Sequence, residues 1–398
     1  MSKLWIVSEY YYPIVTSTGY YVTEIAEFLA GKGLDVNVIT TGVRYNETES
    51  LKMSKKERHN NVVIERMQGG EIDKNNFLKR IIRLSFLSCG LFVLLLKRVR
   101  KGDKVLLVTN PAFLILLMPI VSFLKGVTYT LLVHDVFPEN LLAIGKMKRS
   151  SLNYKCMQFL FDAAYRKAAQ CISIGRDMTE VLKRKIGKDT IVMIPNWSDN
   201  DRVCPQKKED TDLYRELGID KFVFMFAGNL GHVQGLDNLL KAIDMIDNEG
   251  MAFLFIGGGA KANAVKEYAD KHDHVIYKGF QDRSNQNDFL NACDVAIVTL
   301  NDGMYGLGVP SKSYNMMAAG KPILYIGAKD SEIALCIQEY QLGWVVEPDN
   351  PIELAKTMSL IYEGREKWGY MKQNSRKVAE TVFAKDIILE KYYSLLVK

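Results

Sequence analysis

The sequence predicts an α/β protein with two doubly wound domains, each a parallel sheet between layers of helices. Short apolar runs alternate with helical patterns of about 10 to 15 residues along the chain, as in βαβ units. The series of runs starts again after a turn-rich connection at residues 195–201. The chain has 398 residues, which is enough for two domains of about 100 to 200 residues each.

The N-terminal half opens with a strand, a helix and a second strand. Residues 4–8 and 36–40 are apolar runs, and residues 18–32 between them carry a helical pattern that Gly33 closes. Four further apolar runs predict strands at residues 105–109, 129–134, 171–174 and 191–194.

The second half repeats this alternation. Strands are expected at residues 222–227, 253–256, 275–278, 295–299, 322–326 and near 344–346, with helices from Leu236 and at residues 260–271, 285–292 and 311–319. We place the domain boundary near residue 198. This gives an N-terminal domain of residues 1–198 and a C-terminal domain of residues 199–380, and we expect a last helix at about 381–398 to pack back on the first domain.

Two apolar stretches resemble membrane spans. Residues 84–96 are too short, because a spanning helix needs about 20 residues. Residues 105–124 are long enough, but Asn110, Pro111 and Pro119 interrupt them. We interpret this second stretch as a buried strand followed by a helix that Asn110 caps, with Pro111 at its first position.

The cysteines and the N-terminus predict a cytoplasmic protein. The six cysteines lie far apart without a C-x-x-C pair, so we expect reduced core thiols and no metal site. The first apolar run before Ser8 has four residues, whereas a signal peptide needs about 7 to 15, so no export signal is expected.

Basic residues are concentrated in the N-terminal half. Residues 1–200 contain 29 Lys and Arg against 18 Asp and Glu, while the remaining residues contain 23 against 28. This asymmetry predicts that the first half meets a polyanion or an anionic membrane surface.

One apolar segment without acids carries much of this excess. No Asp or Glu occurs between Asp73 and Asp103, whereas the segment includes Lys79, Arg80, Arg83, Lys97 and Arg98. A basic amphipathic helix of this kind can lie in the interface of an anionic leaflet, and we expect these five residues to contact membrane or acceptor. An ordinary core helix with a solvated charged face fits the same pattern. We favour the inner face of the cytoplasmic membrane as the partner, and we expect no nucleic-acid partner.

Two glycine-containing motifs predict phosphate binding. The first, Phe-Ala-Gly-Asn-Leu-Gly-His-Val-Gln-Gly-Leu at residues 226–236, follows a strand and opens a helix, so that backbone N–H groups can approach an anion closely. The second, at residues 306–322, places glycines, Pro310 and Ser311 at a helix start beside Lys312. Together they favour a nucleotide diphosphate ligand.

Two other patterns carry less weight. Asp199-Asn200-Asp201 mimics the D-x-D pattern of metal-dependent sugar transferases, but it lies in the turn-rich connection, and we interpret it as a solvated linker. The run Gly257-Gly258-Gly259 follows a strand, and a lone glycine run is weak evidence for phosphate contact.

The sequence resembles the family 4 glycosyltransferases of the GT-B fold. The resemblance rests on Ala-Gly-Asn-x-Gly-x-x-Gln-Gly-Leu at residues 227–236 and on Val-Pro-Ser-Lys-x-Tyr with Ala-Ala-Gly-Lys-Pro at residues 309–322. It extends to Tyr11-Tyr12-Pro13 through Gly19, to residues 133–139 and to Ile194-Pro195-Asn196. More closely, the sequence is similar to the bacterial subset that builds O-antigen and capsule, including L-fucosamine transferases.

The resemblance implies a retaining, metal-independent transfer of an N-acetylhexosamine-type sugar from a UDP-sugar to a lipid-linked glycan, without a cofactor. It implies that His134 and Asp135 line the reacting centre. The donor-binding residues that it implies are Gly19, Gly228, Asn229, Gly231, His232, Gln234, Gly279, Phe280, Val309, Pro310, Ser311, Lys312 and Asn315. Among them, Gly279 and Phe280 would lie by the nucleobase and Asn315 near the ribose. A phosphate oxygen of the donor would take the acceptor proton.

The sequence departs from the wider family at four positions. Many members carry Arg and Lys where Asn229 and Gln234 stand, and two glutamates where Leu307 and Asn315 stand. Lys312 and His232 would supply part of the missing positive charge. These departures leave open a nucleotide-sugar-binding assembly protein without activity. The two-domain architecture also leaves open a nucleotide-sugar epimerase.

Overall fold

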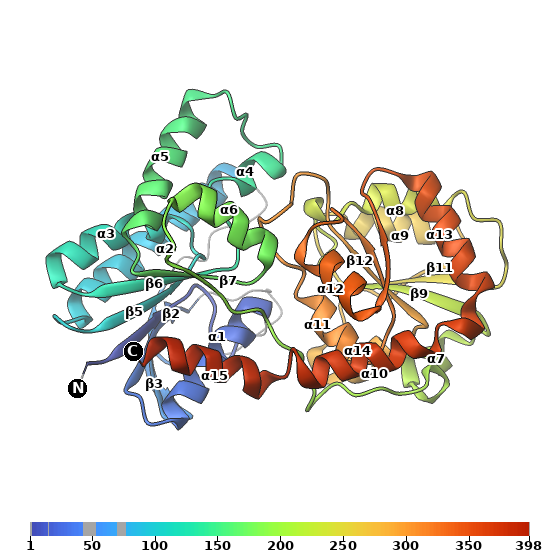
Figure 1. Ribbon diagram of the computed structural model, residues 1–398, viewed down its shortest axis with the longest axis horizontal. Coiled ribbons are helices and arrows are strands. Elements are labelled where there is room, and N and C mark those ends of the chain that lie inside the picture. Colours follow the sequence, from blue (N-terminus) through green and yellow to red (C-terminus); the bar gives the residue numbers. More distant parts are fainter. Residues whose placement is uncertain (1, 15, 43–52, 70–76, 398) are drawn as a thin grey trace. The chain divides into compact units, whose positions relative to one another are not determined.

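The computed structural model describes residues 2–14, 16–42, 53–69 and 77–397, without the side chains of residues 77, 78 and 80 (Figure 1). The chain forms two compact units. Unit 1 consists of Met1–Ile194, Gly306–Gly308 and Leu389–Lys398, and unit 2 of Pro195–Tyr305 and Val309–Ile388. The division therefore falls between Ile194 and Pro195, and two later segments of the chain return to unit 1.

The sheet of unit 1 has the order β3-β4-β2-β1-β5-β6-β7-β8 in the described residues. Its strands are β1 (Leu4–Val7), β2 (Val36–Thr41), β3 (Lys56–His59), β4 (Val62–Met67), β5 (Lys104–Val108), β6 (Thr128–Val133), β7 (Gln170–Ser173) and β8 (Ile191–Met193). All neighbours pair in parallel except β3 and β4. The sequence analysis did not predict β3, which has the polar sequence Lys-Glu-Arg-His at the edge of the sheet, or β4 beside it.

Helices cover both faces of this sheet. They are α1 (Ser17–Gly31), α2 (Phe77–Arg98), α3 (Phe113–Lys125), α4 (Asn140–Ala143), α5 (Leu152–Lys167), α6 (Arg176–Ile186) and α15 (Lys385–Leu396). Figure 1 shows α2, α3, α5 and α6 on one face and α1 with α15 on the other. The expected cap of α3 is wrong: the helix begins at Phe113, because the carbonyl of Asn110 still accepts the Glu9 N–H group at 2.9 Å.

The sheet of unit 2 is parallel, with the order β11-β10-β9-β12-β13-β14. Its strands are β9 (Phe222–Ala227), β10 (Met251–Ile256), β11 (Val275–Tyr277), β12 (Val295–Thr299), β13 (Ile323–Ile326) and β14 (Gly343–Val346). Its α-helices are α7 (Asp212–Leu217), α8 (Leu236–Ile243), α9 (Ala262–Ala269), α10 (Gln286–Asn291), α11 (Lys312–Ala318), α12 (Glu332–Tyr340), α13 (Pro351–Glu363) and α14 (Gly369–Thr381). The predicted class, two α/β units with parallel sheets, is confirmed.

Side chains along β9 point alternately to the two faces of the sheet and so contribute to two cores in unit 2. Val223, Met225 and Ala227 pack with α11, α12 and α14, whereas Phe224 and Phe226 pack with α8 and α13 on the opposite face. The chain crosses from β9 to β10 on one side and reaches β12 on the other. Ligands of doubly wound sheets bind at the carboxyl ends of strands where the order reverses in this way, here β9 and β12.

Two further observations concern the described residues. Within them, no helix combines the length and the apolar character that crossing a membrane requires. The expectation of core thiols is wrong for half of the cysteines: Cys89, Cys156 and Cys204 are exposed, and Cys171, Cys293 and Cys336 are buried.

Candidate functional site

The loops that follow β9, β10 and β11 are joined backbone to backbone. The N–H group of Gly228 donates to the Ile256 carbonyl at 2.9 Å, and that of Leu230 donates to the Gly258 carbonyl at 2.8 Å. The N–H group of Gly257 in turn donates to the Gly279 carbonyl at 2.7 Å. The carboxyl ends of these three strands therefore form one connected platform.

Glycine is required on this platform because the loops approach each other so closely. Gly257 has φ of +135°, and a Cβ there would lie 1.9 Å from the Gly228 carbonyl oxygen. A Cβ at Gly259 would lie 2.5 Å from the Asn229 side-chain oxygen. The run at 257–259 is thus part of the construction of the predicted phosphate loop, which the sequence analysis missed because it weighed each glycine run alone.

The end of β12 holds the second half of the first motif. The Thr299 hydroxyl donates to the Gln234 carbonyl at 2.7 Å, and the Asn301 side-chain amide donates to the His232 carbonyl at 2.8 Å. Gly235 has φ of +61° at the start of α8 and leaves no room for a side chain beside Asn301. Thr299 and Asn301 therefore fix the loop at residues 232–234, and the sequence analysis did not identify either of them.

Lys312 places a buried cation at this platform. Its Nζ lies 3.5 Å from the centroid of the Phe226 ring, and a Cβ at Gly228 would lie 3.6 Å from it. The Nζ is buried and has no hydrogen-bond partner among the described residues. Burial lowers the pKa of Lys312 to about 7. Because an unpaired cation is expensive to bury, this position suits an anion that arrives with a ligand.

Other predicted donor residues lie in unit 2, on the loop after β9 or at the start of α11. Asn229 and His232 are exposed and Gly231 is buried, while a side-chain oxygen of Gln234 is buried without a partner in the described part of the chain. Val309, Pro310 and Ser311 are partly buried at the start of α11.

Asn315 and Phe280 lie at two other places on unit 2. The Asn315 side-chain oxygen accepts the Asp199 N–H group at 3.2 Å, so this side chain also fixes the chain after residue 195. Gly279 has φ of +63° after β11, and the Phe280 ring next to it is 67% exposed. An exposed aromatic ring offers a stacking face to a planar ligand.

The interpretation of Asp199 as part of a solvated linker is wrong. Asp199 is buried, and its carboxylate lies 3.5 Å from Arg283 and 3.9 Å from Arg202. It is a structural ion-pair partner.

In unit 1, His134 and Asp135 follow β6. The Thr109 hydroxyl oxygen, at the end of β5, accepts their backbone N–H groups at 3.1 and 3.3 Å. The Asp135 carboxylate accepts the Asn140 side-chain amide at 3.1 Å. The His134 Nε2 is buried without a partner in the described residues, and burial lowers the pKa of His134 to about 4. His134 is therefore neutral at pH 7 and presents one unused ring nitrogen.

The short segment 306–308 of unit 1 lies beside these two residues. The Val136 N–H group donates to the Leu307 carbonyl at 3.1 Å, and the Gly306 N–H group donates to the Asp177 carboxylate at 3.2 Å. A Cβ at Gly308 would lie 3.6 Å from both the Asp135 carboxylate and the His134 carbonyl. Leu307, where many family members are expected to carry a glutamate, thus uses its backbone to hold the loop after β6.

The loop after β1 contains Gly19 and a buried ion pair. The Gly19 N–H group donates to the Thr16 hydroxyl at 3.0 Å, which caps α1, and Gly19 is buried so closely that a Cβ would meet the Ile14 carbonyl at 2.5 Å. Glu9, two residues after β1, is buried and ion-paired with Arg83 of α2. Arg83 was expected to contact membrane or acceptor, and its burial against Glu9 overturns this expectation.

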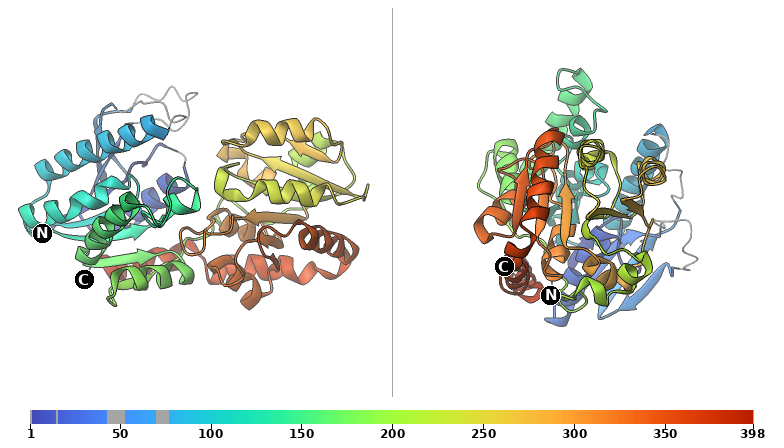
Figure 2. Two further views of the ribbon diagram at one scale, coloured as in Figure 1. Left: turned by 90° about the horizontal axis from the view of Figure 1, so that it is seen from above. Right: turned by 90° about the vertical axis from the view of Figure 1, so that its right-hand side faces the viewer.

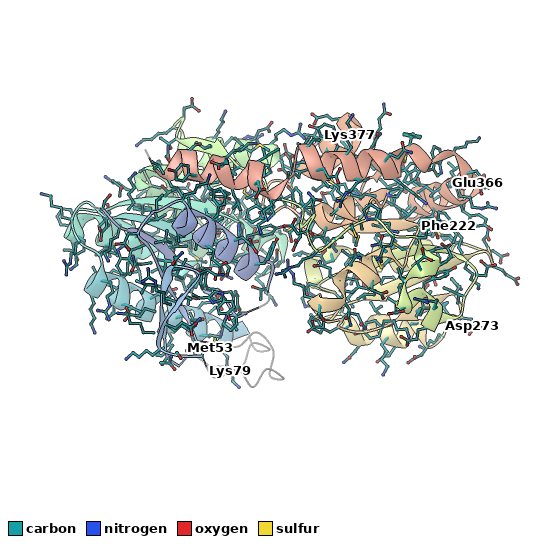
Figure 3. The ribbon with its side chains drawn as sticks, turned by 90° about the horizontal axis from the view of Figure 1, so that it is seen from below. Met53, Lys79, Phe222, Asp273, Glu366 and Lys377 are labelled. Atoms are coloured by element: carbon teal, nitrogen blue, oxygen red, sulfur yellow. The ribbon has the colours of Figure 1, made fainter. Side chains whose placement is uncertain are left out.

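The other predicted basic contacts have different surroundings. Lys79 and Lys97 are exposed, and Figure 3 shows the Lys79 side chain at the outer margin of unit 1. Arg98 makes two hydrogen bonds to the Glu65 carboxylate, at 2.7 and 2.6 Å. The side chain of Arg80 lies outside the described residues. Among the residues whose placement is described, no group of three or more His, Cys, Asp or Glu could hold a metal ion.

Comparisons with known proteins agree on one activity. The family described as "Glycosyl transferases group 1" matches residues 211–378. The chain is 38% identical over 367 residues to the "Probable glycosyltransferase WbjE" of Pseudomonas aeruginosa, covering 91% of this chain and 90% of that protein. It is 25% identical over 364 residues to the "Putative colanic acid biosynthesis glycosyl transferase WcaI" of Escherichia coli K12, covering 87% and 89%.

Solved structures support the fold. A sucrose-phosphate synthase of Thermosynechococcus elongatus superposes with a TM-score of 0.75 at 16% identity, over 100% of this chain and 98% of that one. The HepE protein of Anabaena in complex with UDP-glucose superposes with a TM-score of 0.74 at 16% identity, over 100% of both chains.

Proposed function

Because the chain belongs to the group 1 glycosyltransferases, we propose that it transfers a sugar from a UDP-sugar to a hydroxyl group of a lipid-linked glycan. The observation that carries the proposal is the buried ammonium of Lys312, which has no hydrogen-bond partner in the described residues and lies against the glycine platform of unit 2. A nucleoside diphosphate supplies the negative charge that this position lacks.

The donor diphosphate is assigned to the space above Gly228 and Lys312. There the ammonium and the backbone N–H groups of Asn229 and Gly231 stabilise negative charge, which grows on the leaving diphosphate as the glycosidic bond breaks. The counter-charge is therefore assigned to Lys312 and the backbone. Val309, Pro310 and Ser311 contact donor hydroxyls and phosphates in this arrangement. Phe280 and Gly279 bind the base, and Asn315 lies by the ribose.

The base and the sugar are assigned from relatives and from resemblance. Solved structures of the Anabaena HepE protein contain UDP and UDP-glucose, which supports uracil as the base. The resemblance to L-fucosamine transferases supports an N-acetylhexosamine-type sugar and a retaining outcome.

His134, Asp135 and Gly19 are assigned to the reacting sugar on the basis of the resemblance. A neutral imidazole with a free nitrogen can form one hydrogen bond to a sugar hydroxyl without adding positive charge beside an oxocarbenium-like centre. A donor phosphate oxygen takes the acceptor proton, so the chain needs no strong base of its own at this step.

The acceptor is assigned to bacterial surface polysaccharide synthesis, either O-antigen or capsule. The name of WcaI refers to colanic acid biosynthesis, and the resemblance to transferases that build O-antigen and capsule supports a lipid-linked glycan as the acceptor. The basic excess of residues 1–200 fits a peripheral position at the inner face of the cytoplasmic membrane.

The test is a transfer assay with a panel of UDP-sugars and lipid-diphosphate acceptors, following UDP release and product mass. We expect UDP release that depends on the acceptor and a product that carries the sugar. Lys312→Met should lower the rate by roughly a hundredfold or more, as the loss of a group that stabilises developing charge does. Lys241→Met, on the exposed face of α8, is the control and should leave the rate unchanged.

Two outcomes of this assay contradict the proposal. An isomerised nucleotide-sugar formed without UDP release would identify an epimerase. Tight UDP binding without turnover on any donor and acceptor would identify a binding protein.

A further inference from the structure

Three neighbouring helices of unit 1 expose an unusual share of apolar side chains. Nine of the seventeen large apolar residues that are exposed in the described chain lie on α2, α3 and α5. They are Ile82, Phe86 and Val93 on α2, Ile120, Phe123 and Leu124 on α3, and Leu152, Phe159 and Leu160 on α5. We call these nine residues the helical surface. Scattered exposed apolar residues are normal, but a group on adjacent elements marks an interaction site.

The three helices form one layer. α3 packs against α2 on one side and against α5 on the other, and Figure 2 shows α2 and α3 side by side along the sheet. Phe123 is 87% exposed, Leu152 74% and Phe159 70%. The helical part of the stretch 105–124, which was interpreted as a buried strand followed by a helix, therefore turns some of its apolar side chains outward.

The exposed residues of α2 form a stripe of helical spacing. Ile82, Phe86 and Val93 follow each other at four and seven residues, with the exposed lysines Lys79 and Lys97 at the two ends. The opposite face of the helix contains buried Arg83, Leu87, Leu91 and Leu95. The protein core thus occupies one apolar face of α2, and the outward face remains apolar without contact to that core.

The charged residues of this layer are basic with one exception. Across α2, α3 and α5 the sequence contains a single acid, Asp162, and it is paired at 2.5 Å with the buried Lys185. The same helices contain nine basic residues: Lys79, Arg80, Arg83, Lys97, Arg98, Lys125, Lys155, Arg166 and Lys167. Of these, Arg83 is neutralised by Glu9 and Arg98 by Glu65.

We propose that the helical surface docks on an anionic phospholipid leaflet. Phe123, Leu124 and Phe159 enter the boundary between head groups and acyl chains, and the surrounding lysines lie among lipid phosphates, as in other interfacial helices. The inference rests on the proposed function, because an enzyme with a lipid-linked acceptor works at a membrane. It replaces the predicted contact through Arg83 with a contact centred on α3 and α5.

Charge decides between a leaflet and a second copy of this chain. In a symmetric dimer the same patch faces itself, so the exposed Lys97 and Lys155 would meet the like charges of the other copy. The single acid of these helices, Asp162, is already paired with Lys185. An anionic leaflet covers the apolar side chains and neutralises the cations at once.

The test is flotation of the full chain with vesicles. We expect binding to vesicles of phosphatidylethanolamine with about 30% phosphatidylglycerol as probe, roughly tenfold weaker binding or less to pure phosphatidylcholine vesicles, and weaker binding in about 0.5 M salt. The double variant Phe123→Ser with Leu124→Ser should lower the partition coefficient by roughly tenfold or more. The matched control Ile352→Ser with Leu360→Ser, also at exposed apolar positions but in unit 2, should change it less than about twofold.

A second variant reports insertion directly. Tryptophan at position 123 (Phe123→Trp) should be quenched by phospholipids brominated near the head group, whereas tryptophan at position 360 (Leu360→Trp) should not. Equal vesicle binding by the wild type and the Phe123/Leu124 double variant would overturn the inference. Sedimentation that shows a dimer dissociated by the double variant, without vesicle binding, would assign the surface to a second copy instead.

Failure of this inference can be told from failure of the proposed function. UDP affinity and transfer to a detergent-dispersed acceptor should be the same in the wild type and in the Phe123/Leu124 double variant. If vesicle binding is absent and transfer persists, only the docking surface is wrong. If vesicle binding is present and no donor supports transfer, the proposed function is wrong and the docking surface stands.

Discussion

The ammonium nitrogen of Lys312 lies 3.5 Å from the centroid of the Phe226 ring. Phe226 is the penultimate residue of β9, and Lys312 is the first residue of α11. The ring face attracts the cation and partly offsets its desolvation. It supplies no counter-charge, so burial still lowers the pKa of Lys312 to about 7 in the empty protein.

Replacing this cation should stabilise the empty protein. Lys312→Met removes an unpaired buried charge, and we expect the free energy of unfolding at about pH 6 to rise by on the order of 1 to 3 kcal/mol. The pKa of Lys312 is about 7 in the folded protein and 10.5 for an ordinary solvated lysine, so the unfolded state binds more protons between these values. The penalty is therefore full below about pH 7 and fades as the pH rises towards about 10.5. Urea unfolding at about pH 6 and pH 9 measures this difference, and a less stable variant at the lower pH would contradict it.

Gly257→Ala should disrupt the donor platform. The new Cβ would lie 1.9 Å from the Gly228 carbonyl oxygen at a φ of +135°, so the loops must move apart, at a cost of about 2 to 3 kcal/mol of stability. UDP affinity should fall by roughly tenfold or more. Gly258→Ala is the matched control, because a Cβ there has no atom within 4 Å, and it should change stability by less than about 0.5 kcal/mol. Thermal unfolding measures stability, and calorimetry measures UDP affinity. Equal effects of the two substitutions on both quantities would contradict the requirement for glycine at position 257.

His134 should make stability depend on pH in an acidic window. Its pKa falls from 6.5 to about 4 on folding, so the unfolded state binds more protons between these values. The stabilisation is present above about pH 6.5 and is lost as the pH falls towards about 4, at roughly 1.4 kcal/mol per unit. Carboxylates titrate in the same range in both proteins, so the wild type is compared with His134→Phe. Between about pH 6.5 and 4, the free energy of unfolding should fall by about 3 kcal/mol less in the variant than in the wild type. The same pH dependence in both proteins would show that His134 is not buried as a neutral ring.

Arg83 should matter for folding rather than for membrane contact. Arg83→Gln leaves the Glu9 carboxylate buried without its partner, and we expect a loss of about 3 kcal/mol in urea unfolding. Lys79→Gln, on the exposed stripe of the same helix, should change stability by less than about 0.5 kcal/mol. If Arg83→Gln is as mild as Lys79→Gln, the pair with Glu9 does not hold α2 to the sheet.

Much of the fold could be predicted because the spacing of apolar residues and the Gly and Pro residues that end helices and strands are local features of the sequence. The apolar runs at 222–227 and 295–299 coincide with β9 and β12. β3 escaped prediction because a polar edge strand is defined by its pairing with β4 and has no apolar pattern of its own. Asn110 was expected to cap a helix, and a hydrogen bond from distant Glu9 decides its conformation instead.

In the candidate site, too, local features could be predicted from the sequence and contacts between distant residues could not. Lys312 could be named because a helix start and a basic residue are adjacent in the sequence. The support from Thr299, Asn301 and Gly257 could not, because each acts on a loop that is distant along the chain. Arg83 shows the converse: its helix has two apolar faces, and the sequence alone does not tell which one the sheet covers.

The most direct test of the account is the proton balance of UDP binding. In the empty protein Lys312 is largely neutral at about pH 8, because its pKa is about 7, and a bound diphosphate should make it fully charged. Calorimetry at about pH 8 in two buffers of different ionisation enthalpy should therefore show uptake of close to one proton per UDP, with affinity falling about tenfold per pH unit above about 7. Lys312→Met should abolish the uptake and weaken binding by roughly a hundredfold or more at about pH 7. Binding of UDP to the wild type without proton uptake, and with the same affinity in Lys312→Met, would contradict the assignment of Lys312 to the donor diphosphate.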